Sequence, residues 1–204
     1  MAKKAHSKPE DVPQRIRRAA LNLAAERGWA GLALADIAAA AELSLADLYE
    51  VHPSKAAILE AFSRDIDRQV LAARDESSGE SARDRLFDVL MKRFDALAPH
   101  RDGLAAIVRD AARDPLAMLC WARSLRHSMG SMLEAAGIVS SGIAGELRIK
   151  GLGAIYLATL RDWFRDDTAD KSRTMAALDG RLRRAERCAG WLERRLPSSS
   201  PAAA

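Results

Sequence analysis

Residues 34–55 contain the side chains whose types and spacing are best suited to contacting another molecule. Ser44 and Asp47 stand three positions apart, which is the spacing of a capping box at the start of a helix. The Asp47 carboxylate is therefore either a capping acid or an acceptor for the N4 amino group of a cytosine base. Next to a phosphate group the same carboxylate would be repelled.

Two short helical segments must position these residues. The first runs from about Leu34 to Ala41 and is rich in alanine, with Ile37 among them, and the second begins at Ser44. Two short helices joined by so tight a turn form a helix-turn-helix, whose second helix can enter the major groove of DNA. The spacing thus predicts a DNA-reading motif near the N-terminus.

The composition favours helix along most of the chain. Its 204 residues are 49% hydrophobic and rich in alanine, leucine and arginine, with few β-branched or aromatic residues. Cys120 and Cys188 do not suggest a disulfide framework, which fits a reducing compartment. The N-terminal lysines have no apolar run behind them, and the run 151–160 is well short of the roughly 20 residues that span a bilayer. We therefore expect a cytoplasmic, all-α protein without an integral membrane segment.

The formal net charge of +4 is unevenly distributed. Residues 1–55 carry 8 Lys/Arg and 7 Asp/Glu, residues 56–170 carry 16 and 18, and residues 171–204 carry 8 and 3. A DNA-binding segment usually has a clear basic excess, because neutralisation of phosphates supplies much of the affinity. Here the excess lies at the C-terminal end, where a basic helix can also meet an anionic lipid surface.

Helical periodicity continues along the chain. The first helix is predicted to begin near Asp11, to tolerate Pro13 in its first turn and to end at Gly28. Further helices are predicted over 54–75, 81–97, 101–113, 115–136 and 145–165, followed by a last helix that reaches Leu196. In 54–75 the residues expected to face inward are Ile58, Phe62, Ile66, Val70 and Leu71.

The helix predicted over 115–136 carries methionine and tryptophan on one face. Such a face either is plain core or borders a pocket for a small apolar effector or lipid, because methionine side chains adapt to irregular shapes. The residues expected to line this pocket are Met118, Trp121, Leu125 and Met129 on that helix and Trp163 on the next.

Surplus apolar surface on the last two helices predicts a homodimer. The helix over 145–165 is apolar on two sides and must be covered on both. The last helix repeats apolar residues at alternating steps of three and four, so we expect two copies to form a four-helix bundle. The predicted interface residues are Gly151, Ile155, Leu178, Leu182, Ala185, Ala189 and Leu192.

Three stretches within residues 15–59 carry a family resemblance: RIRRAALNLAAERG, LADIAAAAELS and LADLYEVHPSKAAIL. There the sequence resembles the tetracycline-repressor (TetR) family of bacterial one-component transcriptional regulators. The resemblance implies that three N-terminal helices bind double-stranded operator DNA as half of a dimer, with residues 44–50 as the recognition helix. It also implies that the remaining helices bind a ligand and dimerise, that Tyr49 is a core and phosphate-side residue, and that Lys55 contacts a phosphate. The predicted DNA-contacting residues are Ser44, Leu45, Asp47, Tyr49, His52 and Lys55.

Some positions depart from the family pattern. Ala33 stands where a Thr or Ser usually caps the second helix, a loss of about 1 kcal/mol. Glu42 stands at the usual turn glycine, so a position that favours a positive φ carries a side chain. His52 replaces the usual Phe. The segment SLADLYE, residues 44–50, has two carboxylates and no Lys or Arg.

A second, shorter resemblance covers residues 150–183, which are similar to the C-terminal region of the ubiquinone-biosynthesis lipid-binding family of the same fold. It implies an accessory protein that binds isoprenoid lipid and does not read DNA. The residues that carry it are Trp163, Asp166, Asp167, Asp170, Thr174, Leu178 and Arg181. Read from the residues alone, Thr168 or Asp170 caps the last helix and Arg181 pairs with a nearby acid.

These observations predict an all-α, TetR-like fold of about nine helices. The expected organisation is a tail at 1–10, a three-helix DNA-binding domain at 11–55, a ligand-binding and dimerisation domain at 56–196, and a tail at 197–204. The sequence contains no GxxxxGK[ST], HExxH or GxSxG pattern, so we expect no enzyme, cofactor or metal site. The first functional hypothesis is a dimeric regulator, a repressor, modulated by a small apolar ligand. The second is the lipid-binding accessory protein.

Overall fold

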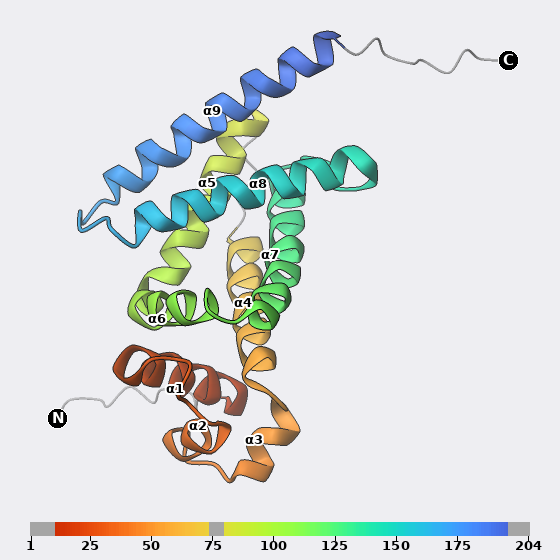
Figure 1. Ribbon diagram of the computed structural model, residues 1–204. Helices are drawn as coiled ribbons and strands as arrows, with labels where there is room; N and C mark the ends of the chain where they lie inside the picture. Colours follow the sequence, from red (N-terminus) through yellow and green to blue (C-terminus); the bar gives the residue numbers. More distant parts are fainter. Residues whose placement is uncertain (1–10, 74–79, 196–204) are drawn as a thin grey trace, which may run out of the picture. The chain divides into compact units, whose positions relative to one another are not determined.

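A computed structural model describes residues 11–73 and 80–195, with side chains described except at 115–117 and 189–195. All regular secondary structure in this part of the chain is helical, which confirms the predicted all-α class (Figure 1). The two predicted tails, 1–10 and 197–204, lie outside the described residues, and so does Leu196, the predicted end of the last helix. The helices are α1 (Val12–Arg27), α2 (Leu34–Ala40), α3 (Leu45–Val51), α4 (Lys55–Ala72), α5 (Ala82–Leu97), the 3-10 helix η1 (Ala98–His100), α6 (Arg101–Ala111), α7 (Pro115–Ala135), α8 (Gly142–Trp163) and α9 (Ser172–Arg195).

The chain forms two compact units. In the described residues, the first unit contains 11–69 and 96–125, and the second contains 70–95 and 126–195. Helices α4, α5 and α7 each contribute to both units. The predicted division after residue 55 stays a prediction. None of the described helices combines the length and the apolar character that crossing a bilayer requires.

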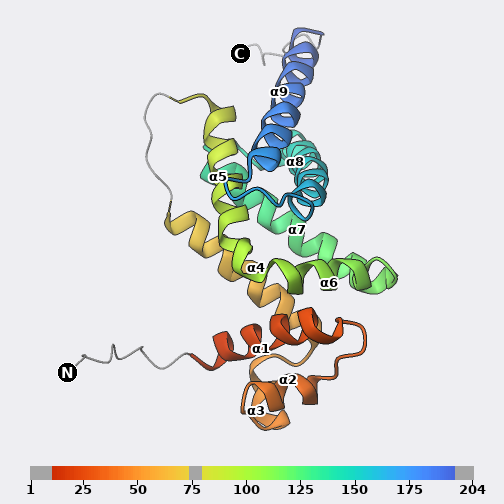
Figure 2. The ribbon, with the colours of Figure 1, turned by 90° about the vertical axis from the view of Figure 1, so that its left-hand side faces the viewer.

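In the first unit, α1 packs on α2, and α2 packs on α3 (Figure 2). Helix α1 has Pro13 in its first turn and ends at Gly28, whose φ of 79° is readily adopted only by glycine. Both of these local predictions are confirmed. Buried apolar side chains from the successive helices form the core of this small bundle: Ile16, Ala20, Ile37, Leu48 and Ile58.

Helix α6 belongs to the same unit and lies against α1 (Figure 2). The approach is close at Gly103, where an added Cβ would lie 2.4 Å from the main-chain oxygen of Leu21. At the other end of α6, Asp110 Oδ2 accepts hydrogen bonds from the main-chain N–H groups of Trp29 at 2.7 Å and Ala30 at 2.8 Å. The loop after α1 is therefore fixed by a side chain about eighty positions later in the chain.

In the second unit, α8 and α9 run side by side (Figure 1). The buried face of α8 includes Leu152, Tyr156 and Trp163, and Phe94 of α5 stacks on Tyr156 with ring centroids 5.4 Å apart. Leu178 and Leu182 of α9 are buried as well. These apolar residues make a continuous core within one chain.

The inward face of α4 differs from the prediction at one residue. Ile58, Phe62, Ile66 and Val70 are buried as predicted, whereas Leu71 is exposed. The four buried residues recur at steps of four, which follows one stripe of a helix. Leu71 stands about 100° around the helix from Val70 and therefore leaves that stripe.

Candidate nucleic-acid interface

The turn between α2 and α3 has the backbone form of a tight helix-turn-helix. Glu42 adopts a φ of 55°, so the prediction of a positive φ at this position is confirmed. The Leu43 N–H donates to the Ala38 oxygen at 2.9 Å, and the Arg15 guanidinium donates to the main-chain oxygens of Ala41 and Glu42. A side chain of α1 thus holds the strained turn in place.

Ser44 begins α3 as its N-cap, which confirms that prediction. Its Oγ accepts from the Asp47 N–H at 3.1 Å, and its hydroxyl donates to Asp47 Oδ2 at 2.6 Å. The Asp47 carboxylate therefore binds the cap hydroxyl. At the start of α2, the residue in the N-cap position, Ala33, makes no side-chain bond, and Asp36 Oδ2 accepts from the Ala33 N–H at 2.8 Å.

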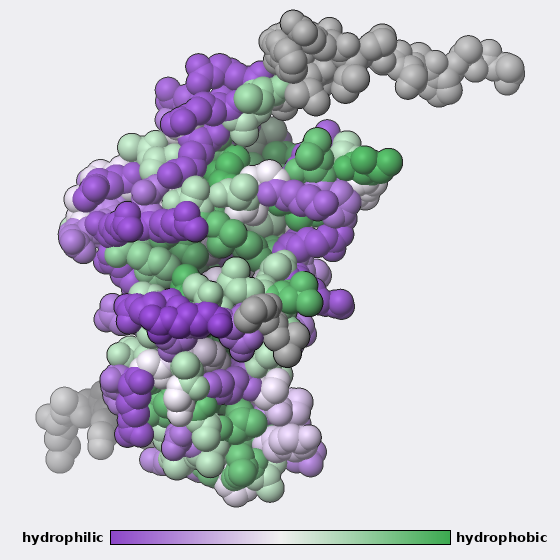
Figure 3. All heavy atoms as spheres, in the orientation of Figure 1, coloured by the Kyte–Doolittle hydropathy of each residue, from purple (hydrophilic) through white to green (hydrophobic). Residues whose placement is uncertain are grey.

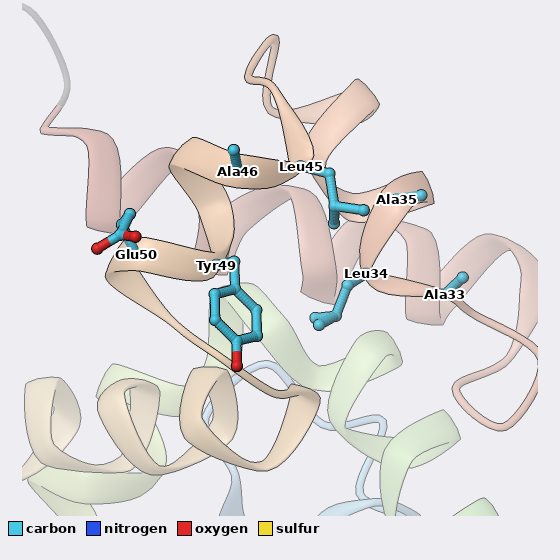
Figure 4. A pocket seen from close by; sticks show the side chains of 7 residues that line it. All are labelled: Ala33, Leu34, Ala35, Leu45, Ala46, Tyr49 and Glu50. Atoms are coloured by element: carbon cyan, nitrogen blue, oxygen red, sulfur yellow. The ribbon is translucent and has the colours of Figure 1, made fainter.

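Helix α3 is anchored by one side chain and presents the others. Leu48 is its buried residue, while Leu45 and Tyr49 are 49% and 58% exposed, so the expected core role of Tyr49 is wrong. Between α2 and α3 lies an open groove of about 610 Å³, which we call the α3 groove. Leu34, Leu45 and Tyr49 gather in it, and Glu50 projects at one end (Figure 4). The groove is lined by residues 33–35, Leu45, Ala46, Tyr49 and Glu50.

Two of the predicted contact residues have polar atoms directed into the chain, and the Nε2 atom of His52 is buried there without a hydrogen-bond partner among the described residues. His52 is 8% exposed, and burial, followed by the charges of Arg17 and Arg64, lowers the pKa of its imidazole. Lys55 Nζ donates to the main-chain oxygens of Trp29 and Leu32, each at 2.8 Å, and burial lowers the pKa of its ammonium group. Their contact with DNA stays a prediction.

Of the six predicted contact residues, the structure brings four together on α3: Ser44, Leu45, Asp47 and Tyr49. Sequence reasoning missed Ala46, Glu50 and the start of α2 as parts of the same surface. The helical period was a usable signal, because a seven-residue helix anchored through Leu48 must expose the positions on its other sides.

The five predicted pocket residues fall in different units. Met129 and Trp163 are buried in the second unit, at 0% and 2% exposure. Met118 is exposed and Trp121 and Leu125 are half-buried, and these three belong to the first unit. In the described part of the chain, no three His, Cys, Asp or Glu side chains cluster so that they could hold a metal ion.

Some of the predicted dimer residues are buried within the chain and others are exposed. Leu178 and Leu182 are buried within the chain itself, because the apolar seam of α9 packs on α8 of the same chain. Gly151 and Ala185 are exposed, and Ile155 is half-buried. The side chains of Ala189 and Leu192 lie outside the described residues.

The acidic turn before α9 has a structural role. Asp166 is buried and accepts from the N–H and hydroxyl groups of Thr168 and Thr174. The Ser172 N–H donates to Thr168 Oγ1 and Asp170 Oδ1, each at 3.1 Å, and Arg181 pairs with Asp162 at 2.6 Å. The predicted capping by Thr168 or Asp170 and the ion pair of Arg181 are confirmed. The residues behind the lipid-binding resemblance therefore maintain the fold.

Comparison with known proteins agrees with this geometry. Residues 16–62 match the family described as bacterial regulatory proteins, tetR family. No curated protein sequence matches the chain. The resemblance of residues 150–183 to the lipid-binding family gains no support from these matches.

Solved structures match over most of the chain. A TetR transcriptional regulator from Nitrosomonas europaea has a TM-score of 0.71 at 22% identity, covering 87% of this chain and 99% of its own. A TetR-family regulator from Rhodococcus has 0.61 at 21%, covering 85% and 98%. Thermus thermophilus FadR, a repressor in complex with lauroyl-CoA, has 0.56 at 20%, covering 94% and 99%. The chain therefore has a TetR-like fold with a TetR-family N-terminal domain.

Proposed function

We propose that the protein is a dimeric transcriptional repressor that binds double-stranded operator DNA through α2 and α3 and responds to a small apolar ligand. The observation that carries the proposal is the exposed face of α3. Ser44 caps this helix, Leu48 anchors it, and Leu45 and Tyr49 point away from the core. In a helix-turn-helix, such side chains reach base edges in the major groove.

The ligand is assigned to the helices that follow the DNA-binding domain. FadR, which shares the fold, is a repressor described in complex with lauroyl-CoA, a ligand with a long apolar chain. In the second unit, Met129, Met132 and Trp163 are buried, and so are the polar side chains of Ser128 and Thr159. Methionine-rich cores of this kind rearrange readily around an apolar guest.

The dimer is assigned to the outer face of α8. Val139, Ile143 and Leu147 are 60%, 93% and 65% exposed, and strongly hydrophobic surface gathers at the turn between α7 and α8 (Figure 3). Gly151 and Ala154 continue the same face of the helix and are exposed, so a partner helix can approach closely. A contiguous apolar patch of this kind marks an interaction site.

A ligand then acts by changing the population of two dimer conformations that bind DNA differently. The shift cannot exceed the difference in the ligand's affinity for the two conformations.

The test is a genome-wide binding assay with the purified full chain. The wild type should enrich sequence-specific sites near promoters, Tyr49→Ala should lose them, and Asn22→Ala should keep them. Asn22 is an exposed residue of α1 and serves as the matched control. Absence of enriched sites for the wild type, with isoprenoid lipid co-purifying, would overturn the proposal in favour of the lipid-binding function.

A further inference from the structure

The exposed residues of α3 form a chemically narrow set. Every residue of Leu45–Val51 except Leu48 is exposed, and these residues are aliphatic, aromatic or acidic. The helix and its cap, residues 44–51, contain no Arg, Lys, His, Asn or Gln. A side chain that reaches a base edge from this helix is therefore an apolar group, a phenol or a carboxylate.

These groups are unsuited to the usual reading of purines. Guanine is most often read by Arg or Lys and adenine by Asn or Gln, in each case through a donor placed at the purine N7. The Ser44 hydroxyl, a donor at the start of α3, is already directed to Asp47 Oδ2 at 2.6 Å. The Tyr49 hydroxyl is a single oxygen with one hydrogen, so it lacks the two-atom fork with which Arg, Asn and Gln pair with a purine.

The same groups suit the edges of pyrimidines. Thymine presents its C5 methyl group, which apolar side chains contact, and cytosine presents its N4 amino group, which carboxylates accept. Leu45 and Tyr49 are the large exposed apolar side chains of the α3 groove (Figure 4). The α3 groove thus offers thymine an apolar surface of the kind that it requires.

Of the two carboxylates on α3, Glu50 is the one with neither oxygen bound to a described residue. Asp47 binds the Ser44 hydroxyl and stays at the helix start. Glu50 is exposed at the end of the α3 groove and makes no hydrogen bond or ion pair with any residue that the structure describes. Its acceptor oxygens are therefore open to an amino group from outside the chain.

We propose that this protein reads its half-site through pyrimidine edges, with Leu45 and Tyr49 on thymine methyl groups and Glu50 accepting from cytosine N4. The inference rests on the proposed function, since it assumes that α3 enters the major groove. It adds the base chemistry of the site: thymine and cytosine are recognised, and purine N7 atoms are left uncontacted.

The experiment begins with selection of binding sites from randomised duplexes by the full-length wild-type chain. The selected duplex is then resynthesised with deoxyuridine for thymidine at each position, which removes only the methyl group. Affinity should fall about three- to fivefold at each contacted thymine, the factor that corresponds to one buried methyl group. Replacement of purines by their 7-deaza analogues, which lack the N7 acceptor, should leave the affinity within about twofold.

The Glu50→Gln variant supplies the second arm, with Glu26→Gln on α1 as its matched control, because both residues are exposed. Glutamine pairs with adenine where glutamate accepts from cytosine. Selection with Glu50→Gln should therefore change the preference at one position from cytosine to adenine and keep the rest of the site. Glu26→Gln should select the wild-type site. The change in preference is a readout that a loss of stability would not produce.

The outcomes separate the two proposals. Pyrimidine reading would be overturned, and the regulator left intact, by three results at a specific site. Deoxyuridine would leave the affinity unchanged, 7-deaza purines would lower it, and Glu50→Gln would select the same bases as the wild type. A wild-type chain that selects no sequence at all would overturn the regulator and this inference with it.

Discussion

The ammonium group of Lys55 lies over the indole ring of Trp29, 4.9 Å from the ring centroid, while its Nζ donates to the main-chain oxygen of the same residue at 2.8 Å. A second hydrogen bond reaches the Leu32 oxygen. Lys55 at the first turn of α4 thus closes the loop that links α1 to α2. A residue expected at a phosphate therefore also binds the main chain of its own unit.

Replacing Lys55 with methionine should lower the stability of the first unit. The oxygens of Trp29 and Leu32 would lose a charged donor, and the loss of such partners costs about 1–3 kcal/mol. Chemical denaturation followed by helical circular dichroism measures the change. Lys150→Met is the control, because Lys150 is an exposed residue of α8 and its replacement should leave the free energy of unfolding within about 0.5 kcal/mol.

The same variant distinguishes the internal role of Lys55 from a phosphate contact. A lysine that binds one phosphate contributes about 0.9 to the slope of log affinity against log salt concentration. If Lys55→Met lowers stability and leaves this slope unchanged, the internal hydrogen bonds are the function of the residue. A reduced slope at unchanged stability would contradict the structural role.

Glu42→Gly should stabilise the helix-turn-helix. Glu42 has a φ of 55°, where a side chain is disfavoured by about 1–2 kcal/mol, and part of the gain is offset by the greater freedom of glycine in the unfolded chain. The ion pair that is lost joins Arg15 to a Glu42 side chain that is 91% exposed, so its contribution is small.

We therefore expect Glu42→Gly to raise the free energy of unfolding, measured by urea denaturation, by about 0.5–1 kcal/mol. Ala39→Gly is the control of opposite sign, because Ala39 is an exposed helical residue of α2 and glycine there should cost about 1 kcal/mol. Equal destabilisation by both glycines would show that the positive φ of residue 42 carries no cost.

Ala33→Ser should add the missing cap of α2. Ala33 already has the extended backbone of an N-cap, with φ −92° and ψ 159°, and the Asp36 side chain already accepts from its N–H. A serine hydroxyl would bind a free N–H of the first turn and raise the free energy of unfolding by about 1 kcal/mol. The comparison is with Ala35→Ser, an exposed position inside α2, which should give no increase.

The local features of the fold were readable from the sequence because their causes lie within a few residues. The end of α1 at Gly28, the cap at Ser44 and the strained turn at Glu42 each follow from one residue type at one spacing. The helix boundaries follow from the period of the apolar residues.

The partners of single side chains were not readable in the same way. Lys55 binds main-chain oxygens more than twenty positions earlier, and the loop after α1 is bound by Asp110 of α6. The seam of α9 shows a second limit. Its period predicts that Leu178 is covered, but a period does not distinguish cover by α8 of the same chain from cover by another copy.

Asp166 should make the free energy of unfolding of the second unit depend on pH. Burial alone would raise the pKa of its carboxyl group, but hydrogen bonds from Thr168 and Thr174 together outweigh burial and hold this pKa well below its usual range. A carboxyl group whose pKa is lower in the folded chain contributes stability above its unfolded pKa, near 4, and that contribution is lost as the pH falls below this value.

Urea denaturation of wild type and Asp166→Asn at pH 7, 5, 4 and 3 tests this dependence. The variant should be less stable at pH 7, and the difference should shrink at pH 4 and below. Asp88→Asn is the control, since Asp88 is an exposed residue of α5. A stability difference that is the same at pH 7 and pH 3 would show that the Asp166 charge does not matter.

Leu147→Glu should weaken the dimer while leaving the chain folded. Leu147 is 65% exposed and stands one turn from Ile143 on the outer face of α8, opposite the buried Tyr156 and Trp163. A glutamate there costs the single chain little, but two copies would have to bury a charge in the apolar contact. Light scattering coupled to size-exclusion chromatography should give a dimer for the wild type and mostly monomer for the variant.

Leu119→Glu gives the matched comparison for the dimer, because Leu119 is 68% exposed but lies on α7. If the outer face of α8 is the interface, this control stays dimeric and keeps its affinity for operator DNA. Leu147→Glu should then also lose most of that affinity, since two DNA-binding domains held together bind a palindrome much more tightly than one domain does. Dissociation by both glutamates, or by the one on α7 alone, would place the interface elsewhere.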